Sequence, residues 1–207
     1  MSSTLDIVVA RYNEDISWLE PLYEHCLVYD KGSAFEDYTT RKIKRVSSIP
    51  NIGREADTYL RYIIENYDSL PNYVFFTQGK VVDHVPNIND IYLLLRALID
   101  GKESIDYHSF TILPNKLREM TIMNFIDPIH KLPLRQCWAQ LFKKSTLEFK
   151  TNYNAIFVVS KERILFRSIE FYKRAWKISL MDEGAYILER FWNVIFDGST
   201  CAVETAT

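Results

Sequence analysis

The sequence has 207 residues, of which 47% are hydrophobic, 25% charged and 14% aromatic. These proportions exclude a disordered chain, and the length suits one folded domain with a sizeable core. The formal net charge of -2 gives no strong field to attract a polyanion, which counts against nucleic acid as a principal partner.

Apolar runs alternate with amphipathic segments in the first half of the chain. The run Leu5–Ala10 (LDIVVA) is rich in β-branched residues and predicts a buried strand that ends at a polar loop. Tyr59, Ile63 and Tyr67 share one face of a predicted helix. The predicted elements are strand Leu5–Ala10, a short helix Ser17–His25 interrupted near Pro21, strand Cys26–Tyr29, helix Arg54–Tyr67 and strand Tyr73–Phe76.

The second half of the chain contains a longer irregular stretch, Lys102–Pro133, which is interrupted by prolines. We expect it to form loops that cover a site, with one strand at Ser109–Leu113. The other predicted elements are helix Asn89–Asp100 followed by Gly101, strand Ala155–Val159, a helix capped by Ser160 and running to Trp176, helix Glu183–Ile195 and a tail from Cys201.

This alternation of strands and helices predicts one α/β domain, with a mixed central sheet flanked by helices. In such sheets ligands lie outside the carboxyl ends of the strands. The segments after Ala10, Tyr29, Phe76 and Val159 are therefore the places to look for chemistry.

The cysteines and the apolar segments predict neither a disulfide framework nor a membrane span. Cys26, Cys137 and Cys201 are far apart and form no C-x-x-C pair. No apolar run approaches the roughly 20 residues that a membrane helix needs, and the N-terminus lacks the features of a signal peptide. We therefore expect a cytoplasmic protein.

Common catalytic motifs are missing from the sequence. It contains no G-x-G-x-x-G, P-loop, G-x-S-x-G or H-E-x-x-H motif, which counts against dehydrogenases, kinases, esterases and zincins. Four polar segments remain at predicted strand ends or helix starts. They are Ala10–Asp15, Asn51–Glu55, Thr77–Gly79 with Asp83 and His84, and Glu189–Trp192.

The segment Asn51–Glu55 (NIGRE) has the features of a diphosphate site. Gly53 allows a close approach of the backbone, the helix that follows offers free N–H groups, and Arg54 adds a guanidinium group. An ordinary helix N-terminus with a surface Arg–Glu pair explains the segment equally well.

Asp83 and His84 follow a predicted buried strand after a short polar loop. A carboxylate beside an imidazole can hold Mn²⁺ or Mg²⁺ against a phosphate. By itself, such a pair more often makes local hydrogen bonds than a metal site.

Carboxylates also recur on the last predicted helix. Asp182, Tyr186 and Glu189 stand at i, i+4 and i+7 and so share one face, while apolar side chains line the other. This pattern predicts a carboxylate face toward a cleft, with a solvated acidic face as the alternative.

The order of these motifs resembles the GT-A glycosyltransferase domains of large algal viruses, together with a family of uncharacterised fungal and bacterial proteins. The shared pattern V-x-x-R-Y-x-E-D, N-x-G-R-E, F-x-Q-G, D-H and E-R-x-W stands here as VVARYNED, NIGRE, FFTQG, Asp83-His84 and ERFW. The resemblance spans Leu5 to Phe196 and is weakest over Lys102–Lys150. It implies a GT-A-like fold and a transferase that uses a UDP-sugar and Mn²⁺ (or Mg²⁺). The acceptor would be a glycan or glycoprotein, which for the viruses is capsid protein glycosylated in the host cell cytoplasm.

The resemblance implies a role for each motif. Residues 1–100 would form the half that binds the nucleotide sugar, residues 101–197 the acceptor side and residues 198–207 a tail. The loop Ala10–Asp15 would hold the base and ribose, and Arg54 the diphosphate. The expected donor-binding residues are Ala10, Arg11, Tyr12, Asp15, Asn51, Arg54, Thr77, Gln78 and Gly79. The expected metal ligands are Asp83 and His84, and the expected catalytic carboxylate is Glu189, with Asp182 in reserve.

One departure from the family pattern keeps alternatives open. Thr77-Gln78-Gly79 stands where such enzymes usually carry Asp-x-Asp, so a metal ion would depend on Asp83, His84 or the diphosphate, or the reaction would need no metal. The missing carboxylates leave a non-catalytic module that binds a nucleotide sugar or glycan as the first rival. A sugar nucleotidyltransferase is the second, although the sequence lacks its Gly-rich, Lys-bearing phosphate loop near residue 10.

Overall fold

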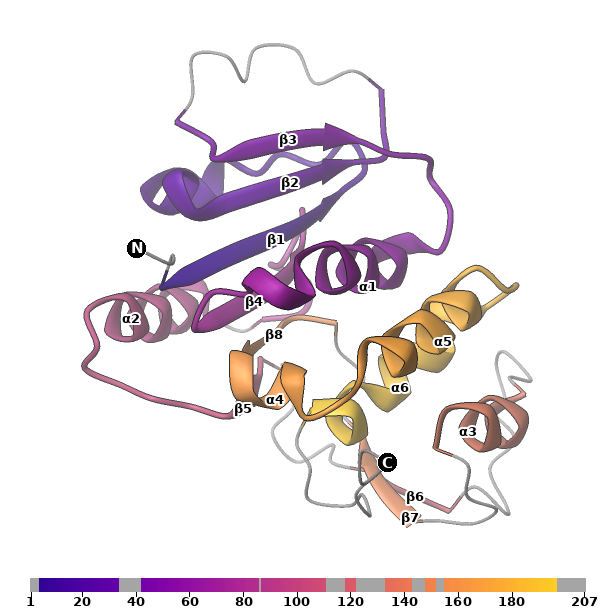
Figure 1. Ribbon diagram of the computed structural model, residues 1–207. Helices are drawn as coiled ribbons and strands as arrows, with labels where there is room; N and C mark the ends of the chain where they lie inside the picture. The colour runs from indigo at the N-terminus through magenta and orange to yellow at the C-terminus, as the bar shows by residue number, and fades with distance from the viewer. Residues whose placement is uncertain are drawn as a thin grey trace.

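A mixed six-stranded sheet in the order β3-β2-β1-β4-β8-β5 lies at the centre of the molecule (Figure 1). The computed structural model describes residues 4–33, 42–85, 87–110, 118–121, 133–142, 148–151 and 155–196. Four neighbouring strands are parallel: β1 (Leu5–Arg11), β2 (Cys26–Asp30), β3 (Arg45–Ser48) and β4 (Tyr73–Gln78). Beyond β4, β8 (Phe157–Ser160) runs antiparallel to both β4 and β5 (Tyr107–Ser109). A separate ribbon pairs β6 (Arg118–Thr121) with β7 (Glu148–Thr151).

Helices cover both faces of the sheet. One face packs against α1 (Arg54–Asn66), α4 (Lys161–Leu165), α5 (Ile169–Ser179) and α6 (Gly184–Phe196), with α3 (Leu134–Phe142) against α5. The opposite face packs against the 3-10 helix η1 (Ser17–His25) and α2 (Ile88–Ile99). A short 3-10 turn, η2 (Tyr67–Ser69), follows α1.

Successive residues of the strands feed two hydrophobic cores. On β1, Val8 and Ala10 belong to the core under α1, whereas Ile7 and Val9 belong to the core under α2. A strand that is buried on both faces needs apolar side chains at every position. This explains why Ile7–Ala10 is a continuous apolar run rather than an alternating one, while Asp6, also buried, accepts hydrogen bonds from Lys44 and Tyr62.

The predicted fold class is confirmed, because the chain forms one α/β domain with a mixed sheet flanked by helices. One predicted element is wrong, and the bounds of another differ. The helix expected from Ser160 to Trp176 is two helices, α4 and α5, because the Ser168 hydroxyl accepts a hydrogen bond from the Phe171 N–H (3.3 Å) and begins a new helix. The strand expected from Ser109 begins at Tyr107, as β5, and residues 111–113 lie outside the described residues, as does the predicted tail.

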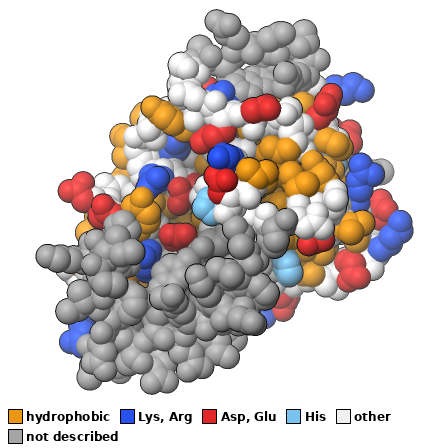
Figure 2. All heavy atoms as spheres, turned by 180° about the vertical axis from the view of Figure 1, so that it is seen from behind, with side chains coloured by type: hydrophobic (Ala, Val, Ile, Leu, Met, Phe, Trp, Pro, Cys, Tyr) orange, Lys and Arg blue, Asp and Glu red, His pale blue; other side chains and the backbone are white. Residues whose placement is uncertain are grey.

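The surface on the α2 side carries exposed apolar residues. Leu93 is 69% exposed and Val82 is 65% exposed. Figure 2, a view from behind, shows hydrophobic side chains gathered on that side. Among the described residues, no helix is both long enough and apolar enough to cross a membrane. Cys26 and Cys137 are buried free thiols, and Cys201 lies outside the described residues.

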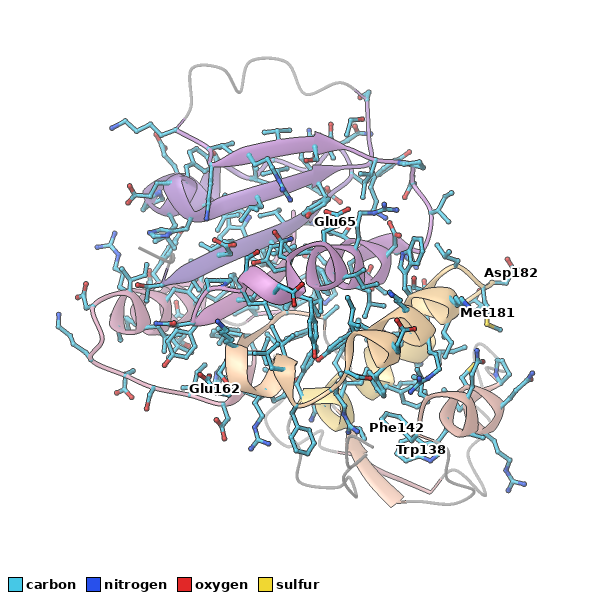
Figure 3. All side chains as sticks on the ribbon, viewed as in Figure 1. Glu65, Trp138, Phe142, Glu162, Met181 and Asp182 are labelled. Atoms are coloured by element: carbon cyan, nitrogen blue, oxygen red, sulfur yellow. The ribbon has the colours of Figure 1, made fainter. Side chains whose placement is uncertain are left out.

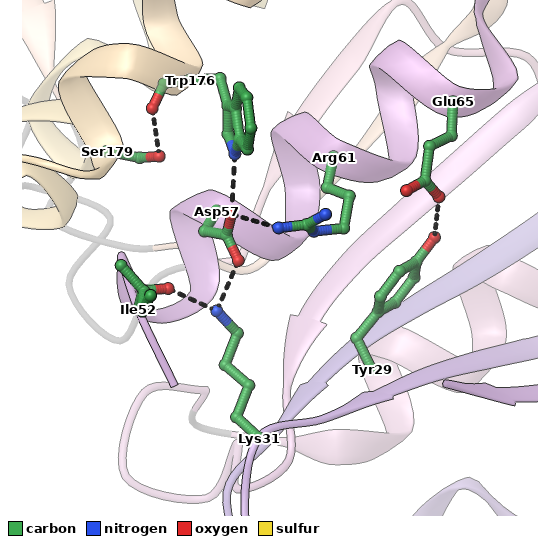
Figure 4. Close-up of polar contacts among 8 residues, drawn as sticks. All are labelled: Tyr29, Lys31, Ile52, Asp57, Arg61, Glu65, Trp176 and Ser179. Atoms are coloured by element: carbon green, nitrogen blue, oxygen red, sulfur yellow. Dashed lines mark hydrogen bonds and ion pairs between the residues drawn. The ribbon is translucent and has the colours of Figure 1, made fainter. Parts of the chain in front are cut away.

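A buried ion pair connects the sheet to two helices (Figure 4). The Lys31 ammonium, just after β2, lies 2.8 Å from the Asp57 carboxylate in the first turn of α1, and the two side chains are only 3% and 1% exposed. The same carboxylate accepts hydrogen bonds from the Trp176 indole of α5 (2.7 Å) and the Arg61 guanidinium (3.2 Å). Lys31 also donates to the Ile52 carbonyl (2.7 Å), so it fixes the chain that enters α1.

We expect Asp57→Ala to lower the free energy of unfolding by about 3–5 kcal/mol, because it leaves the Lys31 ammonium buried without its carboxylate. Urea denaturation measures this change. The matched control is Asp100→Ala, which removes an ion pair with Lys102 whose side chains are 49% and 73% exposed. An exposed pair contributes at most about 1 kcal/mol. Equal losses in the two variants would contradict the importance assigned to the Lys31–Asp57 pair.

Candidate functional site

The parallel part of the sheet reverses its direction of winding at β1. From β1 the chain moves to β2 and β3 on one side, and it later returns to β4 on the other side of β1. Backbone hydrogen bonds continue past the strand ends, with the Lys31 N–H donating to the Arg11 carbonyl and the Gly79 N–H to the Ala10 carbonyl (both 2.9 Å). Ligands of open α/β sheets lie at such a reversal, outside the carboxyl ends of the strands.

A pocket of about 320 Å³ opens at this position. The strand ends contribute Ala10 and Arg11 at the end of β1, Tyr12 and Glu14 after it, Lys31 after β2 and Gln78 at the end of β4. The segment that leads into α1 contributes Asn51, Arg54 and Glu55. The pocket therefore brings together segments of the chain that the sequence places up to 68 residues apart, from Ala10 to Gln78.

Three cations line the pocket, and two of them are held by buried carboxylates. The Arg11 guanidinium lies 2.7 Å from the Asp30 carboxylate, and Lys31 is paired with Asp57. Burial lowers the pKa of Lys31, and the hydrogen bond that its ammonium donates to Asp57 acts against that shift. Arg54 has no carboxylate partner within the described part of the chain and is exposed. It is the cation most accessible to a ligand.

Helix α6 holds Arg54 in place. The guanidinium donates a hydrogen bond to the Tyr186 hydroxyl and lies 4.8 Å from the centre of the Tyr186 ring. Hydrogen bonding and the attraction of a cation to a ring face together restrict the side chain. The C-terminal helices thus take part in shaping a pocket whose lining comes from the first half of the chain.

Gly53 allows α1 to begin at the pocket wall. Its backbone is left-handed, with φ at 64°, and an added Cβ would lie 2.7 Å from the Ser179 carbonyl oxygen and 2.8 Å from the Asp57 Cβ. A glycine N-cap has no side chain to accept a hydrogen bond from the first turn of the helix. Together with the positive end of the helix dipole, such a first turn favours an anion.

Two glutamates lie beside Arg54. Glu55 lines the pocket and is half-buried. Burial raises the pKa of Glu55, although a hydrogen bond from its own backbone N–H and the positive charges of Arg54, Lys31 and His84 act to lower it. On α6, burial and the neighbouring Glu55 raise the pKa of Glu189 to about 7, against the lowering effects of Arg190 and Arg54. At neutral pH the Glu189 carboxyl can therefore both accept and release a proton.

Six of the predicted donor-binding residues line this pocket: Ala10, Arg11, Tyr12, Asn51, Arg54 and Gln78. The Tyr12 side chain is 53% exposed and offers an accessible aromatic ring. Three others do not line it. Asp15 hydrogen-bonds Ser17 instead, Thr77 is fully buried, and Gly79 supplies the backbone N–H that bonds Ala10.

The predicted metal ligands occupy an exposed loop. The Asp83 carboxylate lies 2.7 Å from the Lys80 ammonium, and this contact lowers its pKa. His84 is also exposed, and when protonated it acts to lower the pKa of Glu55. Over the described ranges, no group of three or more His, Cys, Asp and Glu side chains could hold a metal ion. A metal ion at Asp83 and His84 would have to displace Lys80 and take further ligands from a bound phosphate.

The structure separates the two predicted catalytic carboxylates. Glu189 lies on α6, on the same side as Tyr186 and near Arg54. Asp182 precedes α6, so the predicted helical face that includes it is wrong. Figure 3 shows Asp182 at the tip of the turn between α5 and α6, next to Met181 and pointing outward. The left-handed backbone of Glu183 (φ 60°) turns the chain after Asp182 and prevents a continuous helix through it.

Three pocket residues were not predicted: Glu14, Lys31 and Glu55. Glu14 and Glu55 stand inside the motifs VVARYNED and NIGRE, so the sequence did signal them. Lys31 follows the second predicted strand, a position where ligands were expected, but its buried contact with Asp57 has no sequence pattern.

A family model described as "Protein of unknown function (DUF3431)" matches residues 7–207. The chain belongs to this family. The matched span contains every pocket-lining residue as well as Tyr186 and Glu189. No curated protein and no solved structure matches the sequence.

The raised pKa of Glu189 predicts a specific dependence of stability on pH. Because the folded-state value of about 7 exceeds the ordinary 4.5, the stability associated with Glu189 is fully present below pH 4.5 and is lost as the pH rises through 7. Glu189→Gln cannot ionise, so we expect it to match the wild type at pH 5 and to exceed its melting temperature at pH 8.

The exposed Asp182→Asn variant serves as the control and should follow the wild type at both pH values. Thermal unfolding of the three proteins at pH 5, 6, 7 and 8 makes the comparison. If the melting temperatures of Glu189→Gln and the wild type change with pH in the same way, a charge on Glu189 does not destabilise the folded protein.

Proposed function

We propose that this protein is a glycosyltransferase that moves a sugar from a UDP-sugar to a glycan or glycoprotein acceptor. The observation that carries the proposal is the pocket at the carboxyl ends of β1, β2 and β4, where Arg11, Lys31 and Arg54 lie near the start of α1. The five ordered motifs that resemble GT-A glycosyltransferases support it, because three of them contribute to this one pocket.

The pocket suits a nucleoside diphosphate in size and charge. Its volume of about 320 Å³ falls within the range of roughly 300–1,000 Å³ that ligand pockets commonly have. The accessible Arg54 guanidinium and the first turn of α1 can donate to the diphosphate oxygens. The exposed ring of Tyr12 is available to stack against the base, and Asn51 and Gln78 offer amide groups to its polar edge or to the ribose.

In this proposal Glu189 acts as the general base. The acceptor hydroxyl oxygen forms a bond to the anomeric carbon of the sugar as the bond from that carbon to the diphosphate breaks, and UDP leaves with the bonding electrons. The acceptor loses its hydroxyl proton, which Glu189 accepts. A carboxylate with a pKa of about 7 is a stronger base than an ordinary glutamate and is still substantially ionised at neutral pH.

In this proposal a divalent cation would bind together with the donor rather than to the free protein. Asp83 and His84 would supply the protein ligands, and a diphosphate oxygen would supply another. When bound, the cation would offset negative charge on the departing diphosphate. The arginines and the start of α1 can act on the same charge, so binding of the donor is measured both with and without Mn²⁺.

We expect UDP to raise the melting temperature more than GDP or CMP does, since the proposal assigns the pocket to a uridine nucleotide. A ligand at about 100 times its dissociation constant stabilises the folded state by about 2.7 kcal/mol, which thermal shift resolves readily. Each nucleotide is tested with and without Mn²⁺. Equal shifts for the three nucleotides, or none, would contradict a UDP-sugar transferase.

Transfer of the sugar should depend on Glu189. We expect Glu189→Gln to lose about 100-fold or more in turnover while UDP affinity stays near that of the wild type, because an amide cannot accept the proton. Asp182→Asn, at the outward tip of the α5–α6 turn, should keep near-normal turnover. The assay measures UDP release in the presence of acceptor. Normal turnover in Glu189→Gln would remove Glu189 from the chemistry, and UDP-sugar binding without any transfer would favour a non-catalytic module.

A further inference from the structure

The Glu55 carboxylate lies in the wall of the pocket, where it accepts a hydrogen bond from its own backbone N–H and keeps further acceptor positions. Glu55 is the second residue of α1, is half-buried and faces the pocket space. Within the part of the chain that the structure describes, no other side chain forms an ion pair or hydrogen bond with its carboxylate. A half-buried carboxylate without such partners is available to a ligand.

The cations near Glu55 have partners of their own. Lys31 is bound to Asp57 and to the Ile52 carbonyl, and Arg54 donates to the Tyr186 hydroxyl. Asp57 and Tyr186 thus hold two positive side chains near Glu55 without letting either neutralise it by direct contact. The pocket wall therefore places the positive side chains of Lys31 and Arg54 beside the Glu55 carboxylate.

A second carboxyl group stands close to Glu55. Glu55 acts to raise the pKa of Glu189 on α6, and Arg54 acts to lower the pKa of both. Helices α1 and α6 are in contact, and the hydrogen bond from Arg54 to Tyr186 joins them beside the Arg54–Glu55 end of the pocket.

We propose that this end of the pocket is a subsite for the donor sugar, in which Glu55 accepts hydrogen bonds from sugar hydroxyl groups. The inference rests on the proposed function and adds the location of the sugar within the pocket. It also accounts for the position of Glu189, which would lie beside the sugar whose transfer it assists.

The neighbouring charges favour a neutral hydroxyl group over a cation at Glu55. A metal ion or an ammonium group at Glu55 would stand close to Arg54 and Lys31, and like charges repel strongly where water is partly excluded. A hydroxyl group meets no such repulsion and makes a charge-assisted hydrogen bond to a carboxylate. A sugar that presents hydroxyl groups to Glu55 is therefore the ligand that the surroundings favour.

The test compares UDP with UDP-glucose, UDP-galactose and UDP-N-acetylglucosamine by titration calorimetry. We expect the wild type to bind at least one UDP-sugar about 10-fold or more tightly than UDP. Glu55→Gln should abolish that difference while the affinity for UDP itself stays within about twofold. The matched control is Glu65→Gln on the same helix, whose carboxylate is exposed and bonded by the Tyr29 hydroxyl (3.4 Å), and which should behave as the wild type.

Other outcomes overturn the inference in distinguishable ways. Equal losses of UDP and UDP-sugar affinity in Glu55→Gln would place Glu55 at the nucleotide, which leaves the proposed function standing. Loss of Mn²⁺ binding by Glu55→Gln in the absence of nucleotide would make Glu55 a metal ligand instead. Failure of the wild type to bind any uridine nucleotide would overturn the proposed function and this inference together.

Glu55→Asp provides a second variant in case Glu55→Gln does not fold, which circular dichroism would reveal. It keeps the negative charge but withdraws the carboxylate by one methylene group. The sugar-dependent part of the affinity should therefore fall in Glu55→Asp as well. An undiminished preference for the UDP-sugar over UDP in a folded Glu55→Asp protein would contradict the sugar subsite.

Discussion

The buried ion pair between Lys31 and Asp57 attaches α1 to the sheet. It joins the end of β2 to the first turn of α1, and through the Trp176 indole it extends to α5. Removing two charges from water is costly, so such a pair persists only with good geometry and further hydrogen bonds. Here the Ile52 carbonyl, Trp176 and Arg61 supply those bonds.

That ion pair explains why a pocket forms where it does. It holds the start of α1 against the carboxyl ends of the strands, and Gly53 lets the Ser179 carbonyl approach closely from α5. On the sheet side of the pocket, Lys31 is paired with Asp57 and Arg11 with Asp30, so ion pairs hold both side chains in place. Arg54 and Glu55, at the start of α1, remain directed toward the space where a ligand would lie. The division between occupied and available charges is the physical basis of the proposed function.

The sequence predicted the parts of this arrangement that depend on local pattern and strand order. The runs LDIVVA and YVFF form most of β1 and β4. Polar residues at the ends of these strands lie at one edge of the sheet because parallel strands end on the same side. Ser168, which divides α4 from α5, is an ordinary N-cap residue whose signal was overlooked. By contrast, β3 and α3 were not predicted. The four-residue strand β3 is largely exposed and has no apolar run, so it depends on pairing with β2.

The contacts that give the site its properties lie between residues far apart in sequence and have no local signature. Nothing in the sequence indicates that Asp57 would bind Lys31, or that Tyr186 would reach Arg54 across 132 positions. The prediction of Glu189 came from a motif, whereas its raised pKa comes from burial beside Glu55 and became visible only in the fold. Asp182 has a helical spacing to Glu189 in the sequence, but α6 begins after Asp182. The two side chains therefore do not share a helical face.

We propose that the pocket beside α1 binds the diphosphate of a uridine nucleotide. Two exposed arginines allow a matched test, since each donates to a tyrosine hydroxyl and lies near that ring: Arg54 with Tyr186 at this pocket, and Arg45 with Tyr29 at a second pocket lined by Lys44 and Asn66. Calorimetry with UDP should show a loss of about 1.5–3 kcal/mol in binding free energy for Arg54→Ala and no loss for Arg45→Ala. The opposite pattern, or an unchanged dissociation constant in Arg54→Ala, would contradict the account.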